Sequence, residues 1–166
     1  EEALFSMNVA ATDSDLPAQT LTYTLIGAPE GVSVDSAGNL SWTPNEAQGP
    51  GTYGFLLKVA DDGDPALEDL QTVTLKVREV NKPPIVEPRT GLSISETEAW
   101  SFAVPASDPD EPANTLLYFL ESAPTGASIG LFDGVISWTP SEADGPGTFS
   151  FVVTVKDTGK PMLSGV

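Results

Sequence analysis

The chain has 166 residues, of which 24 are Asp or Glu and 7 are Lys or Arg, giving a net charge of −17. This charge opposes binding to nucleic acid or to an anionic membrane surface, because both carry negative charge themselves. The chain has no Cys and no His, which excludes a disulfide framework, a thiol nucleophile, a Ser-His-Asp triad and most zinc or iron sites. Carboxylates remain as the main chemical groups, and they prefer hard cations such as Ca²⁺.

Short strand-like segments follow one another along the first half of the chain. They share alternating or β-branched residues bounded by Gly, Pro, Asp and Asn, and they cover residues 21–25, 39–43, 52–59 and 72–77. No segment keeps a helical period, and hydrophobic residues make up 40% of the chain, which is enough for a buried core. The pattern predicts an all-β fold, an antiparallel β-sandwich of the immunoglobulin-like kind.

The second half of the chain repeats the first. Three motifs recur in the same order, at 11–15 and 106–110, at 41–44 and 137–140, and at 49–52 and 145–148. The offset grows from 95 to 96 residues, so one residue is inserted near Leu131 and Phe132. The repeat predicts two tandem copies of one β-sandwich module, which we place at residues 1–82 and 83–166.

Each module lacks one terminal segment that the other module has. The strand expected at 71–77 has no counterpart in the second module before Val166, and the opening segment 91–95 has no counterpart before Glu1. We therefore expect the first module to lack its first strand and the second module to lack its last. One explanation is that the sequence is cut from a longer protein. The other is that a neighbouring copy supplies the missing strand, because an unpaired sheet edge invites pairing.

Acidic residues gather in three motifs. They are Ala-Thr-Asp-Ser-Asp at 11–15 with its copy at 106–110, Val-Ala-Asp-Asp-Gly-Asp-Pro at 59–65 with its echo at 155–161, and Glu-Val-Asn-Lys-Pro-Pro at 79–84. In this order, and with Ser-Trp-Thr-Pro at 41–44, they resemble the cadherin-like repeats of large bacterial surface proteins, especially the dystroglycan-type or immunoglobulin-like variety. The resemblance covers nearly the whole chain and implies two cadherin-like sandwiches.

The resemblance also implies Ca²⁺ between successive modules. Carried over by position, its ligands are Glu46 from the first module, Glu79 and the Asn81 carbonyl from the linker, and Asp108, Asp110 and Asp157 from the second module. Half-sites are implied at the two outer ends, by Asp13, Asp15 and Asp61 and by Glu96, Glu142 and Asp144. Glu1 is similar in position to the glutamate of the family's first strand, but it is left outside this set.

Three residues depart from the family pattern, the first being Glu79, which replaces an aspartate. Lys82 stands where the family has an acid or an amide, and Gln48 stands where a second acid is common. We therefore expect fewer ions, or weaker binding, than in the animal proteins.

The acidic pairs favour a cation on physical grounds as well. Two Asp residues spaced two apart at a strand end can turn toward one point where the chain leaves the strand. Carboxylates that gather at one point repel each other, and a divalent cation removes that cost. Ca²⁺ takes six to eight oxygens in a loose geometry. Solvated turns are the alternative, because Asp favours turns and helps solubility.

The sequence predicts a structural role outside the cell. We expect Ca²⁺-stiffened spacer or adhesive modules of a bacterial secreted or surface protein, with neighbouring repeats, other surface proteins or polysaccharide as partners. The alternatives are a carbohydrate-binding module and a non-catalytic accessory domain of a secreted enzyme. Trp42 and Trp138 could stack on sugars, but their alternating strand indicates core positions. Tyr53 and Phe149 are the other duplicated aromatic residues that a sugar-binding strip could use, and we expect them in the core too. Paired-carboxylate glycosidase chemistry is disfavoured because the acidic pair recurs in both modules, so no enzyme is expected.

Overall fold

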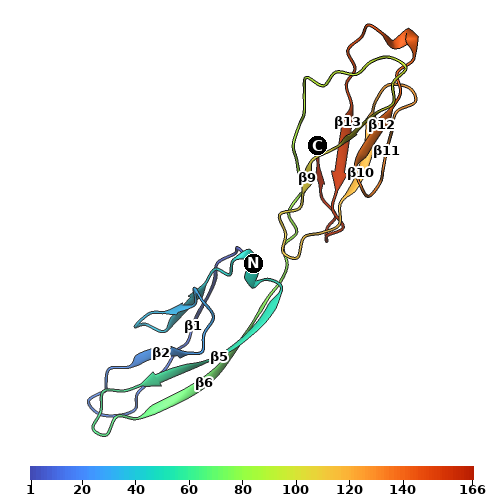
Figure 1. Cartoon of the computed structure of the whole chain (residues 1–166). Helices are drawn as coiled ribbons and strands as arrows, with labels where there is room; N and C mark the ends of the chain where they lie inside the picture. The colour runs from blue at the N-terminus through green and yellow to red at the C-terminus, as the bar shows by residue number, and fades with distance from the viewer. The chain divides into compact units, whose positions relative to one another are not determined.

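The structure is a computed structural model that describes residues 1–166. The chain divides into two compact units, unit 1 at Glu1–Glu79 and unit 2 at Val80–Val166. Both units consist of short antiparallel strands, with one three-residue 3₁₀ helix in each (Figure 1). The predicted all-β architecture of two tandem modules is confirmed. No helix is both long enough and apolar enough to cross a membrane.

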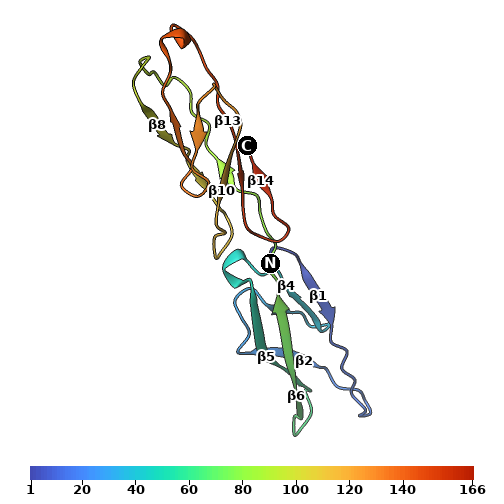
Figure 2. The same ribbon diagram turned by 90° about the vertical axis from the view of Figure 1, so that its right-hand side faces the viewer.

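Unit 1 contains two three-stranded antiparallel sheets. One has the order β1 (Phe5–Asn8), β4 (Asn39–Trp42), β3 (Ser33–Val34), and the other has the order β2 (Thr22–Ile26), β5 (Gly51–Ala60), β6 (Glu68–Val77). β5 pairs with β6 along its full length, from Gly51 opposite Val77 to Ala60 opposite Glu68. Figure 2 shows β1 beside β4 and β6 beside β5. All four strands predicted from the alternation are present, and the last begins earlier than predicted, at Glu68.

Unit 2 has the same plan with shorter strands. Its sheets are β8 (Trp100–Ala103), β12 (Val135–Trp138), β11 (Ser128–Ile129); β10 (Leu117–Ser122), β13 (Val152–Lys156), β14 (Ser164–Gly165); and the pair β7 (Ile85–Val86), β9 (Ala106–Ser107). The opening strand expected at 91–95 is wrong, because that segment forms no strand and pairing occurs earlier, at β7. Gly91 has a φ of 75°, and this left-handed backbone interrupts an extended segment.

The core of unit 1 follows the alternation of β5. Phe55 is 4% exposed and Leu57 is fully buried, and both pack with Val73 of the neighbouring strand β6 and with Leu40 of β4 in the other sheet. Side chains at every second position of a strand point to the same face of the sheet. The alternation therefore delivers these residues to the space between the two sheets.

The duplicated tryptophans are core residues, as the alternation predicts. Trp42 is 2% exposed and Trp138 is 4% exposed. Each indole N–H donates to a backbone carbonyl, of Glu30 at 3.1 Å and of Thr125 at 3.2 Å. Neither ring is available as a platform for stacking on a sugar.

Candidate metal sites

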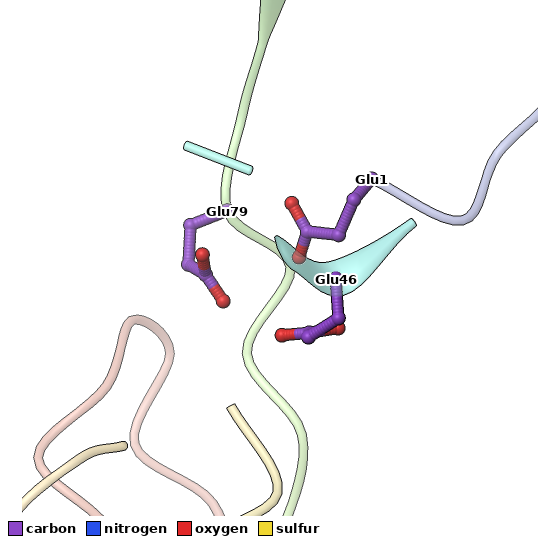
Figure 3. A group of neighbouring side chains, drawn as sticks. All are labelled: Glu1, Glu46 and Glu79. Carbon is purple, nitrogen blue, oxygen red and sulfur yellow. The ribbon is translucent and has the colours of Figure 1, made fainter. Parts of the chain in front are cut away.

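A cluster of three glutamates lies at one end of unit 1. Glu1, Glu46 and Glu79 each contribute one carboxylate oxygen, and these oxygens lie within 4.8 Å of one another. Figure 3 shows that the three side chains come from three separate segments of the chain. Glu46 begins the 3₁₀ helix η1 (Glu46–Gln48), and Glu79 follows β6. The structure thus brings together the two glutamates implied for this end of the first module.

Glu1 completes this cluster, although the predicted ligand set left it out. The residue is only 7% exposed, and its amino group donates to the Arg78 carbonyl at 2.8 Å. Its carboxylate lies against Gly49, so closely that a Cβ there would overlap it. The chain contains no other group of three acidic side chains with oxygens this close together. Carboxylates held at such distances repel one another unless a cation or a proton intervenes.

Aspartates are held in place at the linker end of unit 2. Asp110 is 4% exposed and Asp157 is fully buried. The Asp157 carboxylate accepts the backbone N–H groups of Gly159 at 2.9 Å and Leu163 at 3.1 Å. Asp110 accepts the backbone N–H of Lys82, at 3.1 and 3.2 Å from its two oxygens. Backbone donors therefore fix both carboxylates, which lowers the cost of holding them in a buried place.

Asp108 carries an oxygen that this hydrogen bonding does not satisfy. Its Oδ1 accepts the backbone N–H groups of Asp110 at 3.3 Å and Asn114 at 2.8 Å. Its Oδ2 is buried and has no hydrogen-bond partner. A buried carboxylate oxygen without a donor is costly, and a bound cation is one group that would compensate it.

Asn81 connects these aspartates to the linker. Its side-chain amide donates to the Pro161 carbonyl at 2.9 Å, and its Oδ1 accepts from the Asn114 amide at 3.0 Å. The same Asn114 amide donates to Asp110 Oδ2 at 2.9 Å. The side chain of Asn81 is thus used inside unit 2, which leaves its carbonyl as the group available for a cation.

No role was predicted for Asn114, yet it contacts both members of the acidic pair. Its counterpart in unit 1 is Gln19, which makes the same two contacts with Asp13 and Asp15, each at 3.4 Å. The recurrence of an amide side chain at the same place in both repeats was the signal that could have found it.

The corresponding aspartates of unit 1 are more exposed. Asp13 accepts the backbone N–H of Asp15 at 2.8 Å. Asp61 accepts the N–H groups of Gly63 at 2.9 Å and Leu67 at 3.0 Å, as Asp157 does in unit 2. Asp13 and Asp61 are half-buried and Asp15 is exposed. Asp13 and Asp61 also line one hollow, whereas Asp15 is not among its lining residues, so the structure brings together two of the three residues of the predicted half-site.

The acidic residues at the far end of unit 2 have structural contacts. Glu96 lies against Gly145, as Glu1 lies against Gly49. Asp144 ends the 3₁₀ helix η2 (Glu142–Asp144), and its Oδ2 accepts both the hydroxyl and the N–H of Ser141 at 2.7 Å. These hydrogen bonds, from the hydroxyl first and then the backbone, lower the pKa of Asp144 below its usual range. Gln48 makes the equivalent contact with the N–H of Asn45 in unit 1. The position therefore needs a capping acceptor, which an amide supplies as well as an acid.

Comparisons with known proteins agree with the fold. A family model described as "Putative Ig domain" matches residues 1–78 and again residues 83–164. No curated protein matches the chain. The three solved structures compared below are cadherin extracellular segments, and all are under 25% identical to the chain. They therefore show the fold alone.

The similar structures are themselves longer than this chain. Mouse cadherin-23 EC22–24 has a TM-score of 0.63 and 22% identity, covering 96% of this chain and 56% of that one. The protocadherin gammaB7 EC3–6 cis-dimer structure has a TM-score of 0.60 and 21% identity, covering 92% and 40%. Drosophila N-cadherin EC1–4 has a TM-score of 0.56 and 17% identity, covering 89% and 39%. The chain thus spans about half of these structures or less.

Proposed function

Because the chain belongs to the Putative Ig domain family and carries two tandem copies of that domain, we propose that it is a structural segment stiffened by Ca²⁺. The ion would bind at the connection between the copies and limit their relative motion. The observation that supports this most directly is the cluster of Glu1, Glu46 and Glu79, with oxygens within 4.8 Å of one another. No His or Cys is available, so an oxygen-preferring cation is the natural ligand.

The electrostatics of the glutamate cluster favour a divalent cation. Three carboxylates at this separation repel, and at an effective dielectric constant near 20 each pair at about 5 Å costs roughly 3 kcal/mol. Protonation would relieve this, but it removes the charges that bind Ca²⁺. A bound Ca²⁺ relieves the repulsion with the charges kept, and the carboxylates fit its preference for oxygen ligands.

Residues of unit 2 would supply the other half of the ligand set. Asp108 offers a buried oxygen without a partner, the Asp110 N–H donates to its other oxygen, and Asp110 and Asp157 are buried carboxylates of the same unit. Glu79 and Asn81 are two residues apart, so their Cα atoms cannot be more than about 7 Å from each other. Ligands from the two units are thereby joined through a very short stretch of chain. An ion that binds both sets would restrict the linker.

Binding is expected to be weak. Lys82 replaces the acid or amide that the resemblance leads us to expect, and its positive charge competes with the cation. Extracellular modules bind Ca²⁺ with dissociation constants of about 10⁻⁴ to 10⁻³ M, and we place this chain at the weaker end. Extracellular Ca²⁺ in that range would suffice to occupy such a site.

Location and partners follow from the same proposal. The structural neighbours are described as cadherin extracellular domains, one of them in a cis-dimer. By analogy, we propose that this chain works outside the cell, as part of a bacterial secreted or surface protein. Its immediate partners would be neighbouring repeats of the same protein, and its role would be spacing or adhesion rather than catalysis.

The test compares the whole chain with and without Ca²⁺. Calorimetry should detect binding in the submillimolar to millimolar range, and small-angle scattering should show a longer, narrower particle in Ca²⁺ than in chelator. Replacing Glu46 and Glu79 by Gln, or Asp108 and Asp110 by Asn, should remove both responses. Glu121→Gln is the matched control, because Glu121 is exposed, lies on β10 and belongs to neither cluster. If several millimolar Ca²⁺ gives no heat and an unchanged scattering profile, the proposal fails.

A further inference from the structure

A short stretch of chain connects the regular strands of the two units. Strand pairing in unit 1 ends at Val77, which pairs with β5 and is 6% exposed. The carbonyl of the next residue, Arg78, accepts the amino group of Glu1 at 2.8 Å. In unit 2, pairing begins at β7 (Ile85–Val86), which lies opposite β9. Residues 78–84 therefore form the linker, and its flexibility depends on what holds each of them.

Hydrogen bonds hold the middle of the linker on unit 2. The side-chain amide of Asn81 donates to the Pro161 carbonyl at 2.9 Å, and its oxygen accepts from the Asn114 amide at 3.0 Å. The backbone N–H of Lys82 donates to both carboxylate oxygens of Asp110, at 3.1 and 3.2 Å. All three partners belong to unit 2. Two successive linker residues are thus fixed, one by its side chain and the next by its backbone.

Proline rings and strand pairing fix the residues that follow. The rings of Pro83 and Pro84 lock their φ angles, and a proline also restricts the residue before it. Pro84 is buried, β7 then pairs with β9, and the N–H of Glu87 donates to the Pro105 carbonyl at 3.0 Å. All of these contacts join protein groups, so none of them requires a cation. The chain from Asn81 onward is therefore part of unit 2.

We propose that the connection bends at one point only, the backbone from Glu79 to Asn81, with Val80 as the hinge residue. Bending on either side would break the strand pairing of unit 1 or the hydrogen bonds that hold Asn81 and Lys82. A hinge needs only a few residues that absorb a change in φ and ψ. Val80 is 54% exposed, so turning its side chain opens no cavity in a core. The hinge does not require Ca²⁺, so this inference goes beyond the proposed function and does not rest on it.

A valine at the hinge limits the range of bending. Valine is β-branched and favours extended backbone, so the hinge moves within the extended region more readily than it folds back. Glycine at the same position would remove this restriction, because it has no Cβ and populates a much wider range of φ and ψ. The identity of residue 80 therefore sets how far the two units can turn relative to each other.

Residual dipolar couplings of the whole chain in chelator test where the hinge lies. A neutral liquid-crystalline medium is used, because a chain with a net charge of −17 would interact with a charged one. The strands of each unit define the alignment tensor of that unit. We expect two different tensors, because the units move relative to each other. The couplings of residues 81–86 should fit the tensor of unit 2 as closely as those of β10 and β13 do.

Two variants and a matched control sharpen the test. Val80→Gly should increase the difference in alignment magnitude between the two units. Asn81→Ala removes two side-chain hydrogen bonds, so the couplings of residue 81 should no longer fit the tensor of unit 2, while those of β7 still do. Asn8→Ala is the control, because the amide of Asn8 also donates to a backbone carbonyl, of Ala37 at 3.0 Å, but within unit 1. It should leave the linker couplings unchanged.

Three results would overturn the proposal. A single tensor for both units in chelator would mean that the connection does not bend. Couplings of residues 81–86 that fit neither tensor would mean that the bending is spread over the linker. Couplings of these residues that fit the tensor of unit 1 would place the hinge beyond Val86. Because every measurement is made in chelator, none of these results bears on whether the chain binds Ca²⁺.

Discussion

The same acidic pair has two different environments in this molecule. Asp110 of unit 2 is 4% exposed, whereas its counterpart Asp15 in unit 1 is exposed. The cause is the segment that lies over the pair in unit 2, where the Lys82 N–H donates to both Asp110 oxygens and Asn81 contacts Asn114. An acidic motif alone therefore makes a solvated turn, and in unit 2 the linker residues bury the same motif and fix the direction of its carboxylates.

The largest expected effect on the free energy of unfolding comes from replacing Asp157 in unit 2 or its counterpart Asp61 in unit 1. Asp157→Ala leaves the N–H groups of Gly159 and Leu163 without their acceptor, and each unsatisfied buried donor costs about 1–3 kcal/mol. We expect the free energy of unfolding of unit 2 to fall by about 3 kcal/mol. Asp61→Ala should cost unit 1 about 1 kcal/mol, because Asp61 is only half-buried and water replaces part of what is lost.

Chemical denaturation in chelator, followed by tryptophan fluorescence, measures both variants without any contribution from a bound cation. Asp157→Asn is the control, because it keeps one acceptor oxygen and should recover part of the loss. Equal losses for Asp157→Ala and Asp61→Ala would mean that burial does not distinguish the two sites.

The next largest difference in stability between the units is expected at Gly159 and Gly63, which lie two residues after Asp157 and Asp61. A Cβ on Gly159 would overlap the amide of Asn81, and that amide cannot easily move because Pro161 and Asn114 both hold it. We expect Gly159→Ala to destabilise the attachment of the linker by about 2 kcal/mol, in the range for forced overpacking. Gly63→Ala should cost less, because its Cβ would meet only the flexible side chain of Gln19.

The readout for this pair is amide hydrogen exchange at Asn81 and Lys82. In Gly159→Ala, both amides should exchange faster, while the core strands of unit 2 stay protected. In Gly63→Ala, they should be unaffected. Slow exchange at Lys82 in Gly159→Ala would show that Asn81 does not hold the linker on unit 2.

Removing the side-chain amide of Asn114 or of Gln19 should reduce stability by a smaller amount. Asn114→Ala loses the side-chain bonds to Asn81 and Asp110 but keeps its backbone bond to Asp108. We expect a loss of about 1–2 kcal/mol, because each of the two hydrogen bonds contributes about 0.5–1.5 kcal/mol net. Gln19→Ala should be near neutral, because its contacts with the acidic pair are long, at 3.4 Å. Thermal unfolding of both variants checks this order, and a larger loss for Gln19→Ala would reverse the comparison.

The strands were predictable because β-structure follows local alternation. The segment predicted at 52–59 forms β5 at Gly51–Ala60, and the duplicated Trp42 and Trp138 are buried as expected. The strand expected at 91–95 is absent, because local sequence does not say where a short edge strand finds its partner. That decision depends on pairing with β9, which is distant in the chain.

The acidic groups could be predicted only in part. The resemblance to cadherin-like repeats implied Glu46 and Glu79 as members of one set, and their carboxylate oxygens lie close together in the structure. Glu1 and Asn114 escaped, for two different reasons. Glu1 joins the cluster through the folding of the chain start against Gly49, and Asn114 acts as a hydrogen-bond donor, a role that an amide shows only in three dimensions. The sequence also did not distinguish acids that could bind a metal from acids that cap a 3₁₀ helix. Asp144 is an example, because it accepts a hydrogen bond from the Ser141 hydroxyl at the start of η2.

The smallest expected effect is a pH-dependent link present in unit 1 alone. The Thr20 N–H donates to Asp62 Oδ1 at 2.8 Å, and this backbone bond, the largest cause, lowers the pKa of Asp62 below its ordinary value of 3.8. A carboxylate with a lowered pKa in the folded state adds stability above the unfolded pKa, and this is lost as the pH falls through the folded pKa. The link should therefore be intact at pH 5 and break below about pH 3.8.

Unit 2 has Thr158 at the corresponding position, so it should show no such step. A nuclear magnetic resonance titration of the Thr20 amide should follow the Asp62 carboxyl, and the response should vanish in Asp62→Thr, which copies unit 2. A Thr20 amide shift that stays constant between pH 5 and pH 2 would show that the two loops of unit 1 are not joined by this carboxylate.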